Sequence, residues 1–283
     1  MSEGLGGPEC CQGKVLVITN DFPPRRGGIE TFVHHLCAAV PSDRLVVYTS
    51  SAAGAAQHDA ALDYPVIRDR SAVLLPTRRV ARRGHRVAEA HGCDRVVFGA
   101  AAPLGLLASG LRRAGVRRVV ALTHGHEVWW ARTPLARQAL SRISESVDAL
   151  TYVSDYCRAA IARALPPAGA ARLTRLSPGV DTQRFRPGLD REVWRREWQI
   201  SLEQPVVLAA GRLVARKGHD TLIRVWPAVV RERPDAVLVI VGDGPHRRTL
   251  QKRIARQGLT DSTRLVRDAC WSQMPEIYAA ADV

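Results

Sequence analysis

The sequence predicts an α/β protein with two Rossmann-like domains, each built on a mostly parallel sheet. Short apolar runs rich in β-branched residues alternate with segments of helical periodicity along most of the chain. Such alternation is typical of strand–helix–strand units, whose strands run parallel. Prolines and glycines gather over residues 166–187 and mark a domain boundary. At about 150 residues per domain, the length of 283 residues agrees with two domains, which we place at 14–187 and 188–283.

The first domain opens on Lys14–Thr19 (KVLVIT), which reads as a buried strand. A helix over 29–40 follows, because Phe32, Val33 and Leu36 recur near helical spacing. The other strands that we expect here are 44–49, 94–98, 117–123 and 149–153, and the other helices are 78–91, 103–113, 134–146 and 155–164. The alanine-rich, polar stretch 50–63 is expected to be a loop.

The second domain repeats the pattern over a shorter length. The expected strands are 205–210, 236–241 and 263–266, and the expected helices are 192–199, 219–232, 245–257 and 273–281. The final A-A-A-D-V reads as the end of a helix and the first residue of a further strand. Three strands alone would leave an exposed sheet edge, so we expect this domain to be incomplete and the chain to be C-terminally truncated.

Composition excludes several classes of protein. The hydrophobic fraction of 46% and the charged fraction of 24% are those of a globular chain, not of a disordered or collagen-like one. No apolar run reaches about 18 residues, so no transmembrane helix is expected. The first residues lack a basic stretch followed by an apolar one, so we expect no secretory signal and a cytoplasmic location.

The cysteine pattern agrees with a reducing compartment. The six cysteines contain no C-x-x-C pair, which favours free thiols. They are Cys10, Cys11, Cys37, Cys93, Cys157 and Cys270.

The formal net charge of +14 is the unusual number, and arginine supplies most of it. Aromatic residues make up only 5%, so a surface for stacking nucleic-acid bases is poorly supported and no nucleic-acid partner is expected. The charge favours an anionic membrane surface or a phosphorylated substrate. The candidate lipid-facing residues are Arg78, Arg79, Arg82 and Arg83 on the expected helix 78–91, with an ordinary solvated helix face as the alternative.

The segment N-D-F-P-P-R-R-G-G-I-E follows the first strand and opens the first helix. Gly27 and Gly28 would let the backbone approach a ligand, and the N-terminus of the helix offers free N–H groups. This suits a phosphate or diphosphate, although a tight turn without a ligand explains the pattern equally well.

The segment T-H-G-H-E-V-W-W follows the strand expected at 117–123. If the segment is extended, His124 and His126 point the same way and could face one site. Three interpretations stay open: a metal site with Glu127 as a third ligand, a site for substrate hydroxyls and phosphates, or a packed pair of histidines.

Two further loops follow strands of the second domain. In G-R-L-V-A-R-K-G, a curled loop would bring Arg212 and Lys217 onto one diphosphate, and neutralising a departing nucleoside diphosphate is what transfer from an activated sugar needs. In V-G-D-G-P, Gly242 and Asp243 could contact a nucleotide donor, or the loop could be a structural turn. A basic surface loop is the alternative for the first motif.

These motifs, together with S-P-G-V-D-T-Q-R-F at the domain boundary, occur in the order found in family 4 glycosyltransferases of the GT-B fold, which the chain resembles. Within that family, F-P-P-R-x-G-G-I and T-H-G-H-E-V-x-W are most similar to actinobacterial mannosyltransferases that build phosphatidylinositol mannosides from GDP-mannose. Family members continue past A-A-A-D-V into a segment with two glutamates, E-x7-E, which this sequence does not contain.

The resemblance implies two facing domains and a retaining hexosyl transfer that uses a nucleotide sugar and neither a metal nor another cofactor. Arg212 and Lys217 would hold the donor diphosphate, with Gly27 and Gly28 closing over it. His126 would contact the donor sugar as the catalytic residue, and the leaving phosphate could itself help to deprotonate the acceptor. A lipid acceptor implies a peripheral position on the inner face of the cell membrane.

Three alternatives remain at this point. The same fold could use another nucleotide sugar or a soluble acceptor. The chain could be a truncated, non-catalytic module that binds anionic membranes or nucleic acid. A Rossmann-type oxidoreductase is disfavoured, because no G-x-G-x-x-G follows an expected strand.

Overall fold

The computed structural model describes residues 13–267 and 269–283, and the chain forms two compact units, residues 1–178 and 179–283. Cys10 and Cys11 lie outside the described residues. The division falls nine residues before the boundary that we place at 187/188. The reason is that the segment after Pro178 packs on unit 2: the Arg184 guanidinium donates to the Trp271 carbonyl oxygen at 3.1 Å, and the Phe185 ring lies 5.5 Å from the Trp271 ring.

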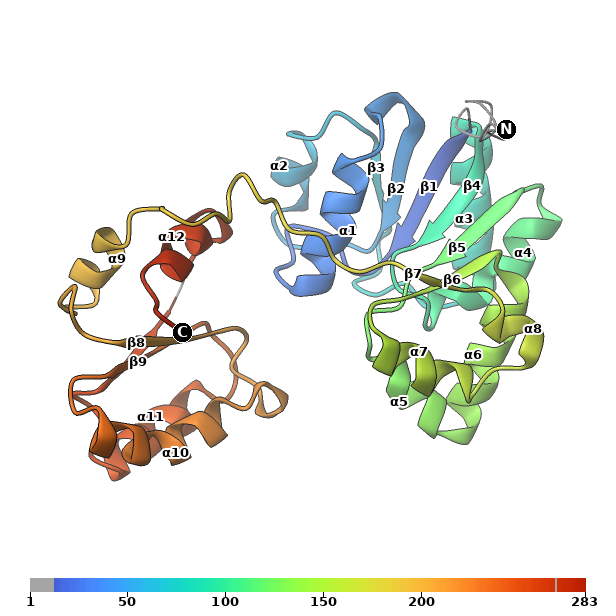
Figure 1. The fold of residues 1–283 in the computed structure, drawn as a ribbon. Coiled ribbons are helices and arrows are strands. Elements are labelled where there is room, and N and C mark those ends of the chain that lie inside the picture. Colours follow the sequence, from blue (N-terminus) through green and yellow to red (C-terminus); the bar gives the residue numbers. More distant parts are fainter. Residues whose placement is uncertain (1–12, 268) are drawn as a thin grey trace, which may run out of the picture. The chain divides into compact units, whose positions relative to one another are not determined.

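Unit 1 is a seven-stranded parallel sheet in the order β3-β2-β1-β4-β5-β6-β7 (Figure 1). Its strands are β1 (Lys14–Thr19), β2 (Leu45–Thr49), β3 (Val66–Arg68), β4 (Cys93–Phe98), β5 (Arg118–Ala121), β6 (Ala149–Tyr152) and β7 (Leu173–Arg175). Its α-helices are α1 (Gly28–Ala38), α2 (Ala55–Asp59), α3 (Arg78–His91), α4 (Ala108–Arg113), α5 (Glu127–Arg132), α6 (Pro134–Ser146), α7 (Asp155–Ala162) and α8 (Pro167–Ala170). The order reverses between β1 and β4, which makes this the topological switch point of a doubly wound sheet.

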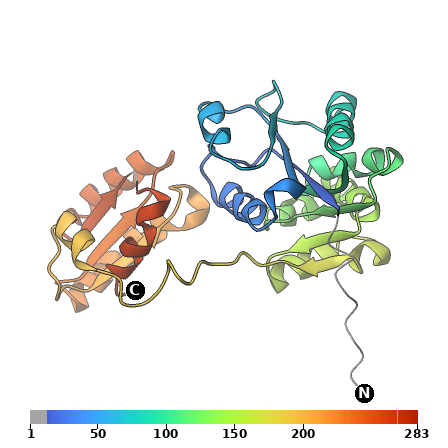
Figure 2. The same cartoon turned by 90° about the horizontal axis from the view of Figure 1, so that it is seen from above.

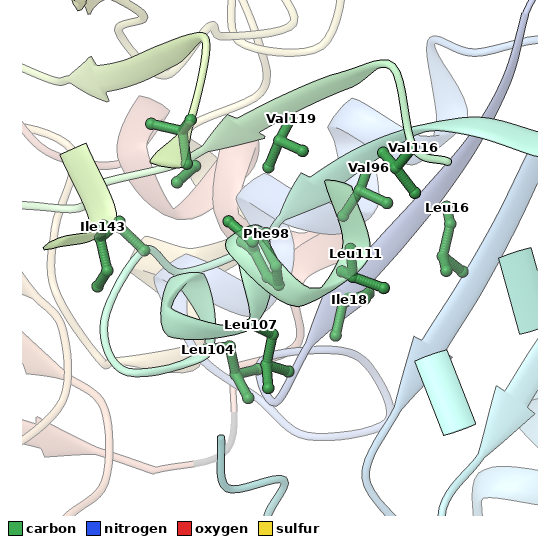
Figure 3. Packing of buried hydrophobic residues seen from close by; sticks show 14 of the residues in the cluster. Leu16, Ile18, Val96, Phe98, Leu104, Leu107, Leu111, Val116, Val119 and Ile143 are labelled. Atoms are coloured by element: carbon green, nitrogen blue, oxygen red, sulfur yellow. The ribbon is translucent and has the colours of Figure 1, made fainter. Parts of the chain in front are cut away.

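Both faces of this sheet are covered, which explains the nearly continuous apolar strands. Leu16 and Ile18 of β1 pack with residues of α3 and α4, and Figure 3 shows this cluster around Phe98. Val17 points to the other face and packs with Val33 of α1. Figures 1 and 2 show the helices on the two faces of the sheet. The alternation of strand residues therefore fixes which helix covers which face.

The structure adds five short elements that the sequence does not predict: α2, β3, α5, α8 and β7. The helices among them are too short to show a helical period, and β3 and β7 are outer strands of three residues each. The loop expected over 50–63 is wrong in detail, because this stretch contains α2. The boundary segment 166–187 contains α8 and β7. The helix expected at 103–113 is a 3-10 helix (Leu104–Leu107) followed by α4.

Unit 2 has a three-stranded parallel sheet in the order β10-β9-β8. Its strands are β8 (Val206–Ala210), β9 (Val237–Val241) and β10 (Thr263–Val266), and its α-helices are α9 (Glu192–Glu197), α10 (His219–Glu232), α11 (Arg247–Arg256) and α12 (Met274–Ala279). Leu238 and Ile240 pack toward α10 and α11, whereas Val237 and Val239 pack toward α12, so both faces are again covered (Figure 1). The α/β class and the two Rossmann-like domains are confirmed.

The last residues of the chain extend the hydrogen bonding of β8. The N–H groups of Asp282 and Val283 donate to the Val206 carbonyl oxygen at 2.9 and 3.2 Å, and the Leu208 N–H donates to the Val283 carbonyl oxygen at 2.8 Å. The expected start of a strand in A-A-A-D-V is thus present as strand-like pairing.

Arg195 is a fully buried cation that holds this end of unit 2 together. Its guanidinium donates to the Ala280 carbonyl oxygen at 2.9 Å and to the Asp282 carboxylate at 2.7 Å. It also donates to the carbonyl oxygens of Ser201, Leu202 and Gln204. Although burial raises the pKa of Asp282, hydrogen bonds from the Val206 N–H and from Arg195 lower it below its ordinary value.

We predict that Arg195→Ala lowers the free energy of unfolding of unit 2 by about 3–5 kcal/mol, because the carbonyl oxygens and the carboxylate lose a buried partner. Urea unfolding followed by tryptophan fluorescence measures the loss. The matched control is Arg196→Ala, since the Arg196 side chain is 80% exposed in a 3.7 Å pair with Glu192 and should change stability by less than about 1 kcal/mol. Equal stability of the two variants would contradict the structural role of Arg195.

Candidate functional site

The loop after β1 lies at the switch point of the unit 1 sheet and is held in place by its own polar side chains. The Asn20 side chain donates to the Leu74 carbonyl oxygen at 3.0 Å and accepts from the Leu74 N–H at 2.6 Å. The Arg25 guanidinium donates to the carbonyl oxygens of Asn20, Ser51 and Ala72. The sequence analysis does not identify Asn20 or Arg25 as residues that hold this loop. The signal that could have found them is the presence of polar side chains in the loop that follows a buried strand.

Gly27 and Gly28 lie at the start of α1 and are exposed, as the phosphate interpretation requires. Gly27 is the residue before the first turn and offers no capping side chain. Glu30, in that first turn, folds back over it: a Cβ at Gly27 would lie 2.1 Å from the Glu30 Oε2 atom. The Glu30 carboxylate thus occupies a favourable position near the positive end of the helix, and a ligand phosphate would have to displace it.

His124, His126 and Glu127 gather at the end of β5. The Thr123 hydroxyl donates to the Thr151 carbonyl oxygen at 2.6 Å and ties this end to β6. The His124 ring nitrogen Nε2 lies 2.6 Å from the Gly99 carbonyl oxygen, at the end of β4. Because a carbonyl only accepts, Nε2 of His124 carries the proton.

The two histidines lie together, but not because the segment is extended as the sequence predicts. The segment is not extended: Gly125 has a φ of +95°, and His126, at −71° and −17°, has a helical backbone and precedes α5. Their rings nevertheless stack, with centroids 6.4 Å apart and an angle of 15° between the planes. The left-handed turn at Gly125 turns the chain from strand to helix and places the rings together.

The metal interpretation of this cluster has no support. In the part of the chain that the structure describes, no group of three or more His, Cys, Asp or Glu side chains could hold a metal ion. Glu127 is instead fully buried, and its Oε2 atom accepts a hydrogen bond from the His124 N–H at 3.0 Å. Its Oε1 atom lies 3.3 Å from His126 Nε2.

Unit 2 brings its two candidate loops together at the ends of β8 and β9. A Cβ at Gly242 would lie 2.1 Å from the Gly211 carbonyl oxygen, so only glycine allows this approach. Gly242 also has a φ of +146°, which favours glycine. Asp243 beside it is exposed and lies 3.8 Å from Arg267.

Arg212 and Lys217 are exposed at the loop that opens α10. Among residues 13–267 and 269–283, neither cation has an acidic partner within salt-bridge distance. Burial, and then the charge of Lys217, lower the pKa of the neighbouring His219 below its ordinary value, so this ring is neutral at pH 7. Arg212 and Lys217, together with the exposed Arg216 between them, therefore carry the positive charge that the loop offers to a ligand.

The basic helix α3 divides into paired and unpaired arginines. Arg79 donates to the Asp69 carboxylate at 2.9 and 3.0 Å, and these bonds hold the pKa of Asp69 well below its usual range. Arg78, Arg82 and Arg83 are exposed, and among the described residues they form no ion pair. No helix in the described part of the chain is long and apolar enough to cross a membrane.

Comparison with solved structures supports the fold. The chain superimposes with a TM-score of 0.76, at 18% identity, on Anabaena HepE solved in complex with UDP and glucose; the match covers 96% of this chain and 73% of HepE. WaaG, a glycosyltransferase involved in lipopolysaccharide biosynthesis, matches with a TM-score of 0.64 at 20% identity, over 95% of this chain and 73% of WaaG. These likenesses show that the chain has the GT-B fold.

Sequence comparison narrows this class. Residues 26–184 match the model described as Glycosyltransferase Family 4, and residues 190–283 match the model described as Glycosyl transferases group 1. A GDP-mannose-dependent alpha-(1-6)-phosphatidylinositol monomannoside mannosyltransferase of Mycolicibacterium smegmatis is 43% identical over 95% of this chain and 71% of its own length. A Corynebacterium glutamicum enzyme named for the monoacylated lipid is 39% identical, with the same two coverages. The chain belongs to glycosyltransferase family 4.

We predict that Gly242→Ala forces the two strand-end loops apart and lowers the free energy of unfolding of unit 2 by about 2 kcal/mol, because the added Cβ meets backbone that cannot rotate away. Urea unfolding measures the change. Gly179→Ala is the control: its Cβ would have no neighbour within 4 Å, so stability should shift by less than about 0.5 kcal/mol. An unchanged Gly242→Ala midpoint would show that the loops are not packed as described.

Proposed function

We propose that this glycosyltransferase moves mannose from GDP-mannose to a phosphatidylinositol mannoside-type lipid, with retention at the anomeric carbon. The observation that carries the proposal is the 39–43% identity, over 95% of the chain, to enzymes named for this donor and this lipid class. In the reaction, the bond between mannose C1 and the phosphate oxygen breaks, and a bond from C1 to an acceptor hydroxyl oxygen forms. The hydroxyl proton passes to the leaving phosphate of GDP.

The donor diphosphate binds at Arg212 and Lys217 in this proposal. As the diphosphate departs it gains negative charge, and two cations without acidic partners stabilise that charge. Arginine supplies a planar pair of donors and lysine a point charge. Gly242 and Asp243 lie on the adjoining loop, where they contact the nucleotide. No metal or further cofactor takes part.

Unit 1 binds the acceptor. Gly27 and Gly28 cover the donor phosphates through the N–H groups at the start of α1, after Glu30 moves aside. His126 contacts the donor sugar near the reacting carbon as the catalytic residue. Support for these roles is the placement of both groups at the carboxyl ends of strands next to the switch point, where ligands of such sheets bind.

The anionic acceptor and the membrane surface meet the exposed arginines of α3. Arg78, Arg82 and Arg83 are the free charges, whereas Arg79 is engaged by Asp69. A protein bound in this way is cytoplasmic and peripheral on the inner face of the membrane. The high net charge of +14 gives the same face a general attraction for anionic lipids.

We predict that GDP stabilises the protein more than UDP or ADP does in a thermal-shift assay. At a hundredfold excess of GDP over its Kd, the expected stabilisation by GDP is about 2.7 kcal/mol. Arg212→Ala and Lys217→Ala should each remove most of this shift, because each deletes a phosphate partner. Arg216→Ala, an exposed arginine in the same loop, is the control and should keep it. A shift retained in both variants would refute the assignment, and selection of UDP or ADP would refute the donor.

We predict that Arg82→Ala with Arg83→Ala weakens binding to phosphatidylinositol-containing vesicles by about 1 kcal/mol per arginine. Co-sedimentation at two salt concentrations measures the loss, which should shrink at high salt. The control carries the same charge change elsewhere: Arg231→Ala with Arg248→Ala, both exposed in unit 2. Equal weakening in the two double variants would mean that total charge, and not α3, sets the affinity.

A further inference from the structure

Glu127 combines full burial with an incomplete set of hydrogen bonds. Its side chain is 0% exposed. The Oε2 atom accepts from the His124 N–H at 3.0 Å, whereas the Oε1 atom has no hydrogen-bond partner in the structure. The His126 Nε2 atom lies 3.3 Å from Oε1 but is not aligned for a hydrogen bond.

A buried carboxylate with a free oxygen is costly, and a nearby donor offsets that cost. In the part of the chain that the structure describes, His126 is the one basic side chain with a nitrogen within 4.0 Å of the Glu127 carboxylate. A small rotation of the half-exposed His126 ring would align its Nε2–H with Oε1, whereas Glu127 is fixed by its burial and by its bond to His124. The ring is therefore the mobile partner and the carboxylate the fixed one.

We propose that Glu127 is a positioning residue for His126. Its Oε1 atom accepts the Nε2–H of the imidazole, which fixes the orientation of the ring and the position of its proton. In the tautomer with its proton on Nε2, the imidazole has its lone pair on Nδ1, where it can accept a hydrogen bond from a sugar hydroxyl. The inference rests on the proposed contact between His126 and the donor sugar.

The His124 ring can be compared with the His126 ring, because the position of its proton follows from a hydrogen bond. Its Nε2 atom faces the Gly99 carbonyl oxygen at 2.6 Å, so its proton also lies on Nε2. The two stacked rings thus give their Nε2 protons to the protein, one to a backbone carbonyl and one to a carboxylate. Only the partner of His126 can be changed by a side-chain substitution.

Glu127→Gln tests the proposal because it is nearly isosteric. The glutamine oxygen must still accept from the His124 N–H, so its NH2 group faces His126 Nε2 and needs an acceptor there. The His126 proton should therefore move to Nδ1. The measurement is the 15N spectrum of histidine-labelled protein, with the His126 signals assigned by their loss in His126→Ala.

We expect the wild-type His126 ring to be protonated on Nε2 and the Glu127→Gln ring on Nδ1, with the His124 signals unchanged. In transfer assays, kcat of Glu127→Gln should fall by at least about tenfold, while KM for the nucleotide sugar changes by less than about twofold. The control is Glu145→Gln on α6, an exposed glutamate, which should match the wild type in both measurements.

A wild-type His126 ring protonated on Nδ1 would overturn the proposal, and this result does not depend on whether Glu127→Gln folds. An unchanged tautomer and kcat in Glu127→Gln, alongside an inactive His126→Ala, would also overturn it. A fully active His126→Ala would instead refute the proposed role of His126 in the reaction. The spectra and the assays therefore separate failure of this inference from failure of the proposed function.

Discussion

The reversal of strand order between β1 and β4 is the constraint on which the unit 1 site depends. Chain segments leaving these neighbouring strands diverge, so polar groups at their ends stay accessible to a ligand. The two strands are packed so closely there that a Cβ at Gly99 would lie 2.5 Å from the Thr19 hydroxyl. The Gly99 carbonyl oxygen then accepts a hydrogen bond from His124 Nε2, and the His124 N–H donates to the Glu127 Oε2 atom. These contacts connect the close packing of the strands to the position of the two histidines.

Unit 2 also presents its candidate residues on loops at the ends of parallel strands, but these residues are charged. Its loops also follow parallel strands, and the close approach of Gly242 to Gly211 holds them together. What they present is charge: two exposed cations next to a histidine whose lowered pKa keeps it neutral. One unit thus offers hydrogen-bonding groups of fixed direction and the other offers unpaired positive charge.

Much of this arrangement can be predicted from the sequence, and the exceptions have physical causes. Strands such as β1 and helices such as α3 and α10 are long enough for their periodicity to fix their class, and the motifs fall at their ends. The short α5 has no such period, so the histidine segment reads as extended although a left-handed glycine turns it into a helix. The burial of Glu127 and the pairing of Arg79 with Asp69, ten residues earlier, depend on how the chain folds back on itself, which the periodicity of a single helix does not show.

The proposed reaction is the transfer of mannose from GDP-mannose to an inositol-containing phospholipid without a metal. Its most direct test is the fate of radiolabelled mannose when GDP-mannose, phosphatidylinositol monomannoside vesicles and EDTA are supplied together. We predict that label enters the lipid fraction at the rate seen without EDTA, and that UDP-glucose radiolabelled in its glucose, supplied in place of GDP-mannose, gives no labelled lipid. Transfer only to water-soluble acceptors, or transfer abolished by EDTA, would contradict the account.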